Sequence, residues 1–174
     1  MPNSSRTGCM GRPENSWRIG CYKYLSPAVY HEKMHNPYRG GTPDDWFSGN
    51  ARDLWAEVKF VVVPARDTTM IVPNLSPLQL KWLTERHAQG RNCWVIVGCK
   101  EGGTILRNPR DWSGITTREF RQLLMSRREV AQTIERFVQH HTSPAVEPNG
   151  QGILNAHQRK RSLPRTGSRA QSVG

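Results

Sequence analysis

Two acidic residues and one lysine have the types and the spacing of a site that could hold a divalent metal ion. Asp44 follows Pro43, and Glu57 and Lys59 lie two positions apart further along the chain. Carboxylate oxygens are preferred ligands of Mg²⁺ and Mn²⁺, which keep several bound waters. A lysine amine can stabilise developing negative charge on a phosphate, or orient and deprotonate an attacking water. The three side chains therefore indicate metal-assisted attack of water on a phosphate, provided that the fold brings them together.

The segment that carries Glu57 and Lys59, residues 53–63, has the pattern of a β-strand. Side chains alternate between the two faces of a strand, so Glu57 and Lys59 share one face. We expect both charges to be at least partly buried, which requires compensating partners. The alternative is an exposed cross-strand pair on a solvated face. The opposite face of the strand is wholly apolar and carries Leu54, Ala56, Val58, Phe60 and Val62.

A hairpin is expected to bring Asp44 back beside Glu57. Residues 45–47 can form a short strand, and residues 48–50 have the Ser-Gly-Asn composition of a turn. The longer strand after the turn would return alongside the short one. Asp44 and Glu57 would then meet at one end of the sheet and bind Mg²⁺ or Mn²⁺ together.

Other oxygen atoms nearby are further candidates for metal ligands. The backbone carbonyl of Val58 lies next to the predicted site. Asp45 directly follows Asp44, and Asp53 is also close in the sequence, so either could replace Asp44 as the first carboxylate. These alternatives remain open at the level of sequence.

The motif Pro43-Asp44 followed by Glu57-x-Lys59 on a strand resembles that of the PD-(D/E)XK nuclease superfamily, which includes restriction enzymes, Holliday-junction resolvases and VRR-NUC nucleases. The wider stretch from residue 35 to residue 59 is similar to small phage-encoded nucleases of this superfamily, and the resemblance covers residues 22–100. It implies a restriction-endonuclease-like core and metal-dependent hydrolysis of DNA. An endonuclease acting on branched DNA in phage replication or recombination is the expected form of that activity.

The resemblance also implies roles for individual residues. Asp44 and Glu57 would be metal ligands and Lys59 the catalytic lysine. Many members add a glutamate on the first helix, which here would be Glu32, although a solvated helix acid is an equally good interpretation. Some members carry a glutamine on the helix after the motif strand, and Gln79 has that place. Gln79 is also the third residue of a predicted helix, where glutamine commonly completes a capping box.

The remaining signals predict helices on a mixed sheet. Ser26-Pro27 has the pattern of a helix start and Pro37 that of a helix end, so a short helix is predicted from Ser26 to Pro37. A second helix is predicted over residues 76–90. Two strands follow at residues 92–98 and 104–107, and one long amphipathic helix is predicted from Thr116 to Val138. The order indicates an α/β (α+β) fold with a mixed central sheet and flanking helices.

The composition indicates where the folded domain begins and ends and which kind of partner it binds. The formal net charge of +11 suits a polyanion such as DNA. Residues 1–15 and the basic tail at 143–174 are predicted to be disordered, which leaves a nuclease domain at 16–142. The tail is either an electrostatic arm or a solubilising segment. The sequence predicts no membrane span, no small-molecule cofactor and a cytoplasmic protein, in the host cytoplasm if phage-encoded.

Several interpretations stay open beside this one. A non-catalytic basic protein that binds nucleic acid or associates with a virion would have the same charge. A homodimer could form through the last helix. His31 and His35 have the spacing of a metal-binding pair on a helix, without a third ligand. Trp46 and Trp55 could stack on bases, although core packing is the more usual role.

Overall fold

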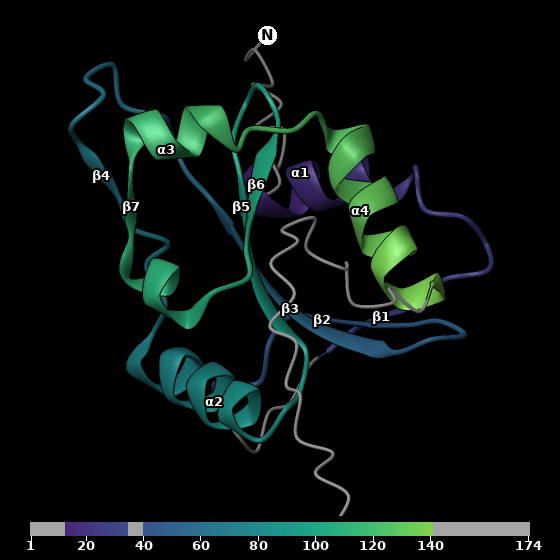
Figure 1. Cartoon of the computed structure of the whole chain (residues 1–174). Coiled ribbons are helices and arrows are strands. Elements are labelled where there is room, and N and C mark those ends of the chain that lie inside the picture. Colours follow the sequence, from purple (N-terminus) through teal and green to yellow (C-terminus); the bar gives the residue numbers. More distant parts are fainter. Residues whose placement is uncertain (1–12, 35–39, 141–174) are drawn as a thin grey trace, which may run out of the picture. The chain divides into compact units, whose positions relative to one another are not determined.

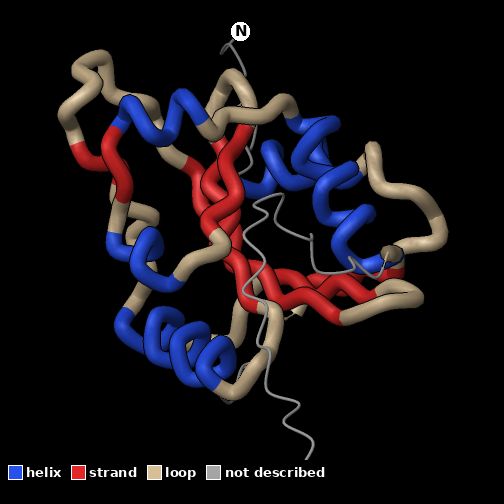
Figure 2. Tube along the Cα trace, in the orientation of Figure 1, coloured by secondary structure: helices blue, strands red, loops and turns tan. Residues whose placement is uncertain are grey.

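The computed structural model describes residues 13–34 and 40–140, and a five-stranded mixed sheet is its central element. The strand order is β1-β2-β3-β5-β6, in which β3 and β5 are parallel and the other neighbours antiparallel. The predicted α/β class, a mixed sheet with flanking helices, is confirmed (Figures 1 and 2). The strands are β1 (Tyr30–Lys33), β2 (Asp45–Ser48), β3 (Asp53–Phe60), β5 (Cys93–Gly98) and β6 (Gly103–Leu106).

Helices cover both faces of this sheet. Figure 1 shows α1 (Pro13–Tyr22) and α4 (Arg127–Gln139) on one side of β5 and β6, and α2 (Pro77–Ala88) and α3 (Thr117–Gln122) on the other. Parallel strands cannot be joined by a tight turn, and α2 lies in the crossover that leads from β3 to β5. The first turn of α2 lies beside β3, because Gln79 near its N-terminus contacts Glu57 of that strand.

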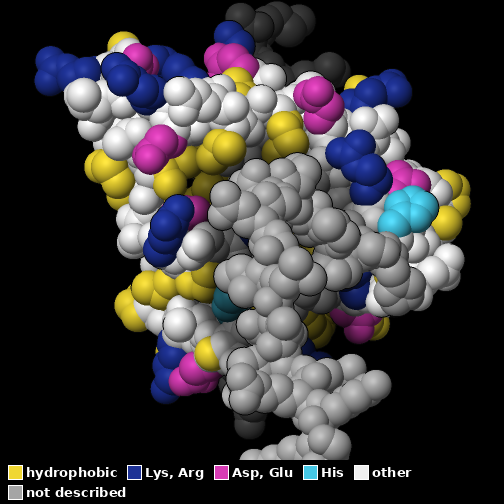
Figure 3. All heavy atoms as spheres, viewed as in Figure 1, with side chains coloured by type: hydrophobic (Ala, Val, Ile, Leu, Met, Phe, Trp, Pro, Cys, Tyr) yellow, Lys and Arg dark blue, Asp and Glu magenta, His cyan; other side chains and the backbone are white. Residues whose placement is uncertain are grey.

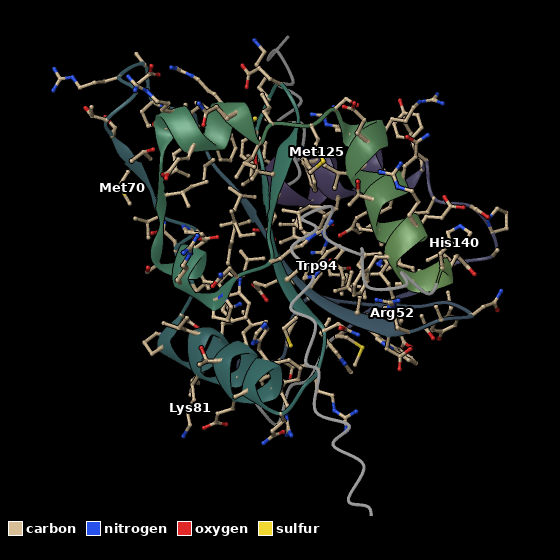
Figure 4. All side chains as sticks on the ribbon, viewed as in Figure 1. Arg52, Met70, Lys81, Trp94, Met125 and His140 are labelled. Atoms are coloured by element: carbon tan, nitrogen blue, oxygen red, sulfur yellow. The ribbon has the colours of Figure 1, made fainter. Side chains whose placement is uncertain are left out.

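Each face of the sheet has its own apolar core. Leu54, Ala56 and Val58 are fully buried on the face covered by α1 and α4, as the alternation in the sequence predicted. In Figure 4, Trp94 on β5 lies on this same side, where its ring packs 4.5 Å from the ring of Phe137 on α4. The second core, between the sheet and α2 and α3, contains the alternate residues of β5 and Leu83 of α2.

A small second sheet was not predicted from the sequence. It pairs β4 (Met70–Ile71) with β7 (Ile115–Thr116), and a 3-10 helix, η1 (Pro109–Ser113), precedes β7. Met70 projects from the outer edge of this sheet (Figure 4) and is 51% exposed. Within the described residues no helix is long and apolar enough to cross a membrane.

The N-terminal part of the prediction was wrong in two places. The first helix is α1, which begins at Pro13 and so includes three of the residues expected to be disordered. The helix predicted from Ser26 does not form. Instead, residues 30–33 are strand β1, because their backbone pairs along the edge of β2. Ser26 does not cap a helix, and its hydroxyl accepts a hydrogen bond from Ala28 N in a turn. Residues 1–12, 35–39 and 141–174, including the predicted tail, lie outside the described residues.

The last predicted helix is two helices. The capping box at Thr116 opens α3, and a second capping box at Ser126, completed by Glu129, opens α4. Two such boxes ten residues apart reset the backbone direction, because each N-cap residue has an extended conformation. Met125, between the helices, forms an antiparallel bridge with Gly103.

Candidate active site

The hairpin of β2 and β3 brings Asp44 and Glu57 together as the sequence predicted. Asp45 pairs with Ala56 and Trp46 with Trp55. Extending this antiparallel register by one residue sets Asp44 opposite Glu57. The negative charge of Asp44 acts on the pKa of Glu57, which is consistent with this proximity.

Glu57 lies at the centre of the site and is fully buried. Its Oε1 atom lies 2.7 Å from Lys59 Nζ and accepts a hydrogen bond of 2.5 Å from Gln79 Nε2. Its Oε2 atom is buried and has no hydrogen-bond partner among the described residues. Since a buried carboxylate oxygen without a partner is costly, the geometry fits a group that binds a cation.

Gln79 completes the capping box that the sequence predicted, and its side chain also contacts Glu57. Its Oε1 atom accepts a hydrogen bond from Ser76 N at 2.9 Å, and its backbone N donates to the Ser76 hydroxyl, which completes the capping box of α2. The amide nitrogen of the same side chain then donates to Glu57. The cap fixes the orientation of the amide, so the start of α2 positions Glu57.

The pKa of Glu57 is raised to about 7. The largest cause is burial, which penalises the charged carboxylate, and the negative charge of Asp44 acts in the same direction. Lys59 opposes both effects through its hydrogen bond and its charge, and the backbone N–H of Asp44 also acts to lower the pKa. Glu57 is thus a carboxylate that gains from a further positive charge at neutral pH.

Asp45, which the sequence left as an alternative to Asp44, has a different role. It is fully buried, and its two oxygens are bound by Arg18 at 2.7 Å, Tyr22 at 3.0 Å and His31 at 2.9 Å. These partners lie on α1 and β1 and give each oxygen of the carboxylate at least one partner. Asp45 is therefore a structural residue of the opposite face, whereas Asp44 remains available to the site.

Two residues of α1 that sequence reasoning missed also reach the site. The pKa of Glu14 is raised, first by burial and next by the charge of Asp44, and Lys59 acts on it as well. The Arg18 guanidinium lies 3.6 Å from Asp44 Oδ2 and 3.9 Å from Glu14 Oε1. With Lys33, these residues line a hollow of about 280 Å³. The missed signal was Pro13-Glu14, a proline and an acid suited to the first turn of a helix.

Trp17 holds α1 in this place. Its indole nitrogen donates to Gly102 O at 2.7 Å, and its ring lies against the end of β5. A Cβ atom on Gly98 would lie 2.5 Å from the ring, so glycine is needed for this close approach. The contact fixes α1 on the sheet and with it Glu14 and Arg18.

Three other candidates lie outside the group. Glu32, predicted on the first helix, is an exposed residue of β1 that accepts a hydrogen bond from the Tyr30 hydroxyl, so the acid on the first helix is Glu14 instead. Asp53 is exposed at the start of β3, four residues before Glu57. His31 stacks on Phe47 and binds Asp45, and its predicted partner His35 lies outside the described residues.

The donor set fits a hard divalent ion held by few protein ligands. Mg²⁺ is commonly bound through one or two carboxylates and keeps its remaining waters. Asp44 and the unpartnered oxygen of Glu57 supply such a pair, with Glu14 near them. In the described part of the chain, no three or more His, Cys, Asp or Glu side chains are already gathered closely enough to hold a metal. The carboxylates would complete their arrangement around the ion, and the carbonyl of Val58 remains a predicted ligand.

Comparison with known proteins gives likenesses in structure and none in sequence. No model of a protein family matches the sequence, and no curated protein is similar to it in sequence. The structure is similar to that of Hjc, a Holliday junction resolvase from the archaeal hyperthermophile Archaeoglobus fulgidus, with a TM-score of 0.43 and 16% sequence identity. The match covers 70% of this chain and 97% of that chain.

Proposed function

We propose that the protein is a metal-dependent nuclease of the PD-(D/E)XK superfamily that hydrolyses phosphodiester bonds in DNA. The observation that supports this most strongly is the buried Glu57, with one oxygen bound to Lys59 and Gln79 and the other without a partner, next to Asp44. A protein that only binds nucleic acid gains nothing from two acids beside a lysine, because the acids repel phosphate.

Each side chain has a distinct task in this proposal. Asp44 and Glu57 bind Mg²⁺ or Mn²⁺, which supplies a bound water of lowered pKa and neutralises charge on the phosphate. Lys59 keeps a hydrogen bond to Glu57 and directs its other N–H groups to the phosphate or to the attacking water. Gln79 holds the carboxylate of Glu57 in its rotamer, and Arg18 holds Asp44.

The finer parts of the proposal concern the substrate and the assembly. We propose an endonuclease that acts on branched DNA in phage replication or recombination, in the cytoplasm of the host. Resolution of a junction needs two active sites, so a homodimer belongs to this form of the proposal. On the face drawn in Figure 3, Lys and Arg side chains lie at several separate places.

The test is a panel of linear, flapped and four-way-junction DNAs incubated with Mg²⁺, Mn²⁺ or EDTA. We expect cleavage with either metal and none with EDTA. Asp44→Asn, Glu57→Gln and Lys59→Met should each lower the rate by about 100-fold or more, the usual cost of removing one group that stabilises transition-state charge. Glu101→Gln, at an exposed acid in the turn between β5 and β6, is the control and should retain full activity.

Three outcomes would count against the proposal. Cleavage that persists in EDTA, or that is equal in all variants, would place the activity at another site or in a contaminant. DNA binding by the wild-type protein without any cleavage would support a non-catalytic basic DNA-binding protein instead.

A further inference from the structure

The tryptophans of this chain divide into two groups. Trp17, Trp94 and Trp112 are 1%, 4% and 2% exposed and belong to the cores. The other three, Trp46, Trp55 and Trp82, are only partly buried and contact one another. Trp55 and Trp82 pack with part of their rings against the core between the sheet and α2, and all three rings keep part of their surface in water. A partly exposed aromatic cluster of this kind fits a flat partner.

These three residues form a continuous aromatic row across the sheet and onto α2. The rings of Trp46 and Trp55 are nearly parallel, with centroids 6.0 Å apart, and the centroids of Trp55 and Trp82 are 5.4 Å apart. Tyr30 of β1, which is 53% exposed, extends the row with an edge contact of 5.3 Å to Trp46.

The row lies beside the candidate active site. Trp55 precedes Glu57 by two residues on β3 and therefore shares its face. Trp82 follows Gln79 by three residues on α2, so the two side chains lie on neighbouring positions of the helix surface. Both elements that position the Glu57 carboxylate thus also carry a partly exposed indole ring.

Two hollows flank the row, and each combines an indole ring with cationic side chains. Trp55 lines one of about 360 Å³ with Arg91 and Asp53, and Trp82 lines another of about 390 Å³ with the residues of α2 around it. The second hollow contains Arg86, whose guanidinium lies 5.7 Å from the Trp82 ring centroid, and Lys81 and Glu85, which face each other at 3.9 Å. In Figure 4, Lys81 points outward from α2.

We propose that Trp46, Trp55 and Trp82 are a stacking site for unpaired bases of a DNA strand whose backbone enters the active site. Every base has a flat face that stacks on an indole ring, and Arg86 and Arg91 have the charge to bind the phosphates between such bases. The bases of an intact duplex stack on one another and do not present their faces. The row therefore selects DNA with unpaired nucleotides next to the scissile bond. This inference rests on the proposed nuclease function and specifies its substrate.

The test measures binding in EDTA, so that cleavage plays no part. Fluorescence anisotropy would compare a single strand, a flapped duplex and a blunt duplex, and 2-aminopurine placed in the unpaired strand would report stacking by loss of its emission. We expect tighter binding of the first two and quenching of 2-aminopurine. Trp82→Ala should weaken binding of unpaired DNA by about 10-fold, within the range for loss of one base–aromatic stack, and leave duplex binding unchanged.

Two variants keep the result interpretable. Trp82→Phe retains a ring and should bind almost as the wild type does, which separates stacking from damage to the fold. Leu123→Ala, an exposed apolar residue of the loop after α3, is the control and should change nothing. If Trp82→Ala unfolds, the quenching by the wild type and by Trp82→Phe still decides the question.

Equal affinity for all three DNAs without quenching would overturn this inference. So would a dimer in sedimentation experiments that dissociates in Trp82→Ala while DNA binding is unaffected, since the row would then be a protein interface. Cleavage that depends on Glu57 without base stacking would refute only the stacking site. Stacking without any metal-dependent cleavage would refute the nuclease and retain the site.

Discussion

The two faces of the β2–β3 hairpin differ although they are built from alternate residues of the same strands. On the face towards α1 and α4, Phe47, Leu54 and Val58 are fully buried, and the one acid, Asp45, has a partner for each oxygen. On the face towards α2, Glu57 is equally buried but keeps an oxygen without a partner. One face thus stabilises the fold, and the other carries a buried carboxylate oxygen without a hydrogen-bond partner.

The largest expected difference is between the adjacent acids Asp44 and Asp45. Asp45→Ala should lower the free energy of unfolding by about 3–5 kcal/mol, because the buried guanidinium of Arg18 loses its closest partner. Asp44→Ala, at a side chain that is 29% exposed, should change stability by less than about 1 kcal/mol and abolish cleavage. Urea denaturation with a cleavage assay measures both. Equal destabilisation by the two substitutions would contradict the division between the faces.

The apolar face can be tested along β3. Leu54→Ala removes a fully buried side chain and should cost about 2–5 kcal/mol of stability. Val62→Ala, at a residue just after β3 that is 87% exposed, is the matched control and should stay within about 0.5 kcal/mol of the wild type. Thermal unfolding of both variants gives the comparison. A similar loss in both would mean that burial does not account for the stability of this face.

The buried Glu57 should make the stability of the folded chain depend on pH. The pKa of Glu57 is about 7 in the folded chain against an ordinary value of 4.5, so the folded state holds the proton more tightly. The stabilisation from this proton is fully present below about pH 4.5 and is lost as pH rises through 7, by up to about 3 kcal/mol. In EDTA, unfolding of the wild type should show this loss between pH 5 and 8, and Glu57→Gln should show less of it. Protection by Mn²⁺ should grow over the same range, since the metal binds the ionised carboxylate.

The smallest expected effect separates the two roles of Gln79. Gln79→Ala removes the capping box and the bond to Glu57, and should lower stability by about 1 kcal/mol and also slow cleavage. Gln79→Glu keeps an acceptor for the cap but places a negative charge beside Glu57. It should retain the stability of α2 and still lose activity. Full activity in Gln79→Glu would mean that the amide does not position Glu57.

Local patterns predicted the part of the fold that positions the site. The alternation along residues 53–60 gave β3 and its two faces, and the serine and glutamine at 76 and 79 gave the start of α2. The predicted helix from Ser26 failed because β1 forms through pairing with β2, a partner twelve or more residues away that local signals do not report. The break between α3 and α4 was readable in principle, because Ser126 and Glu129 repeat the capping pattern of Thr116 and Glu119.

The sequence by itself determined that Asp44, Glu57 and Lys59 could meet, because a hairpin and the two-residue period of a strand are local properties of the chain. Only the tertiary structure decided between Asp44 and Asp45, and it did so through Arg18, which reaches Asp45 from a helix 27 residues earlier in the sequence. It also placed Glu14 near Asp44 and Glu32 on an exposed strand position, since α1 packs where its Trp17 meets the glycines of β5 and β6. The burial of Glu57 and its contact with Gln79 arise from elements distant in sequence, which local patterns do not report.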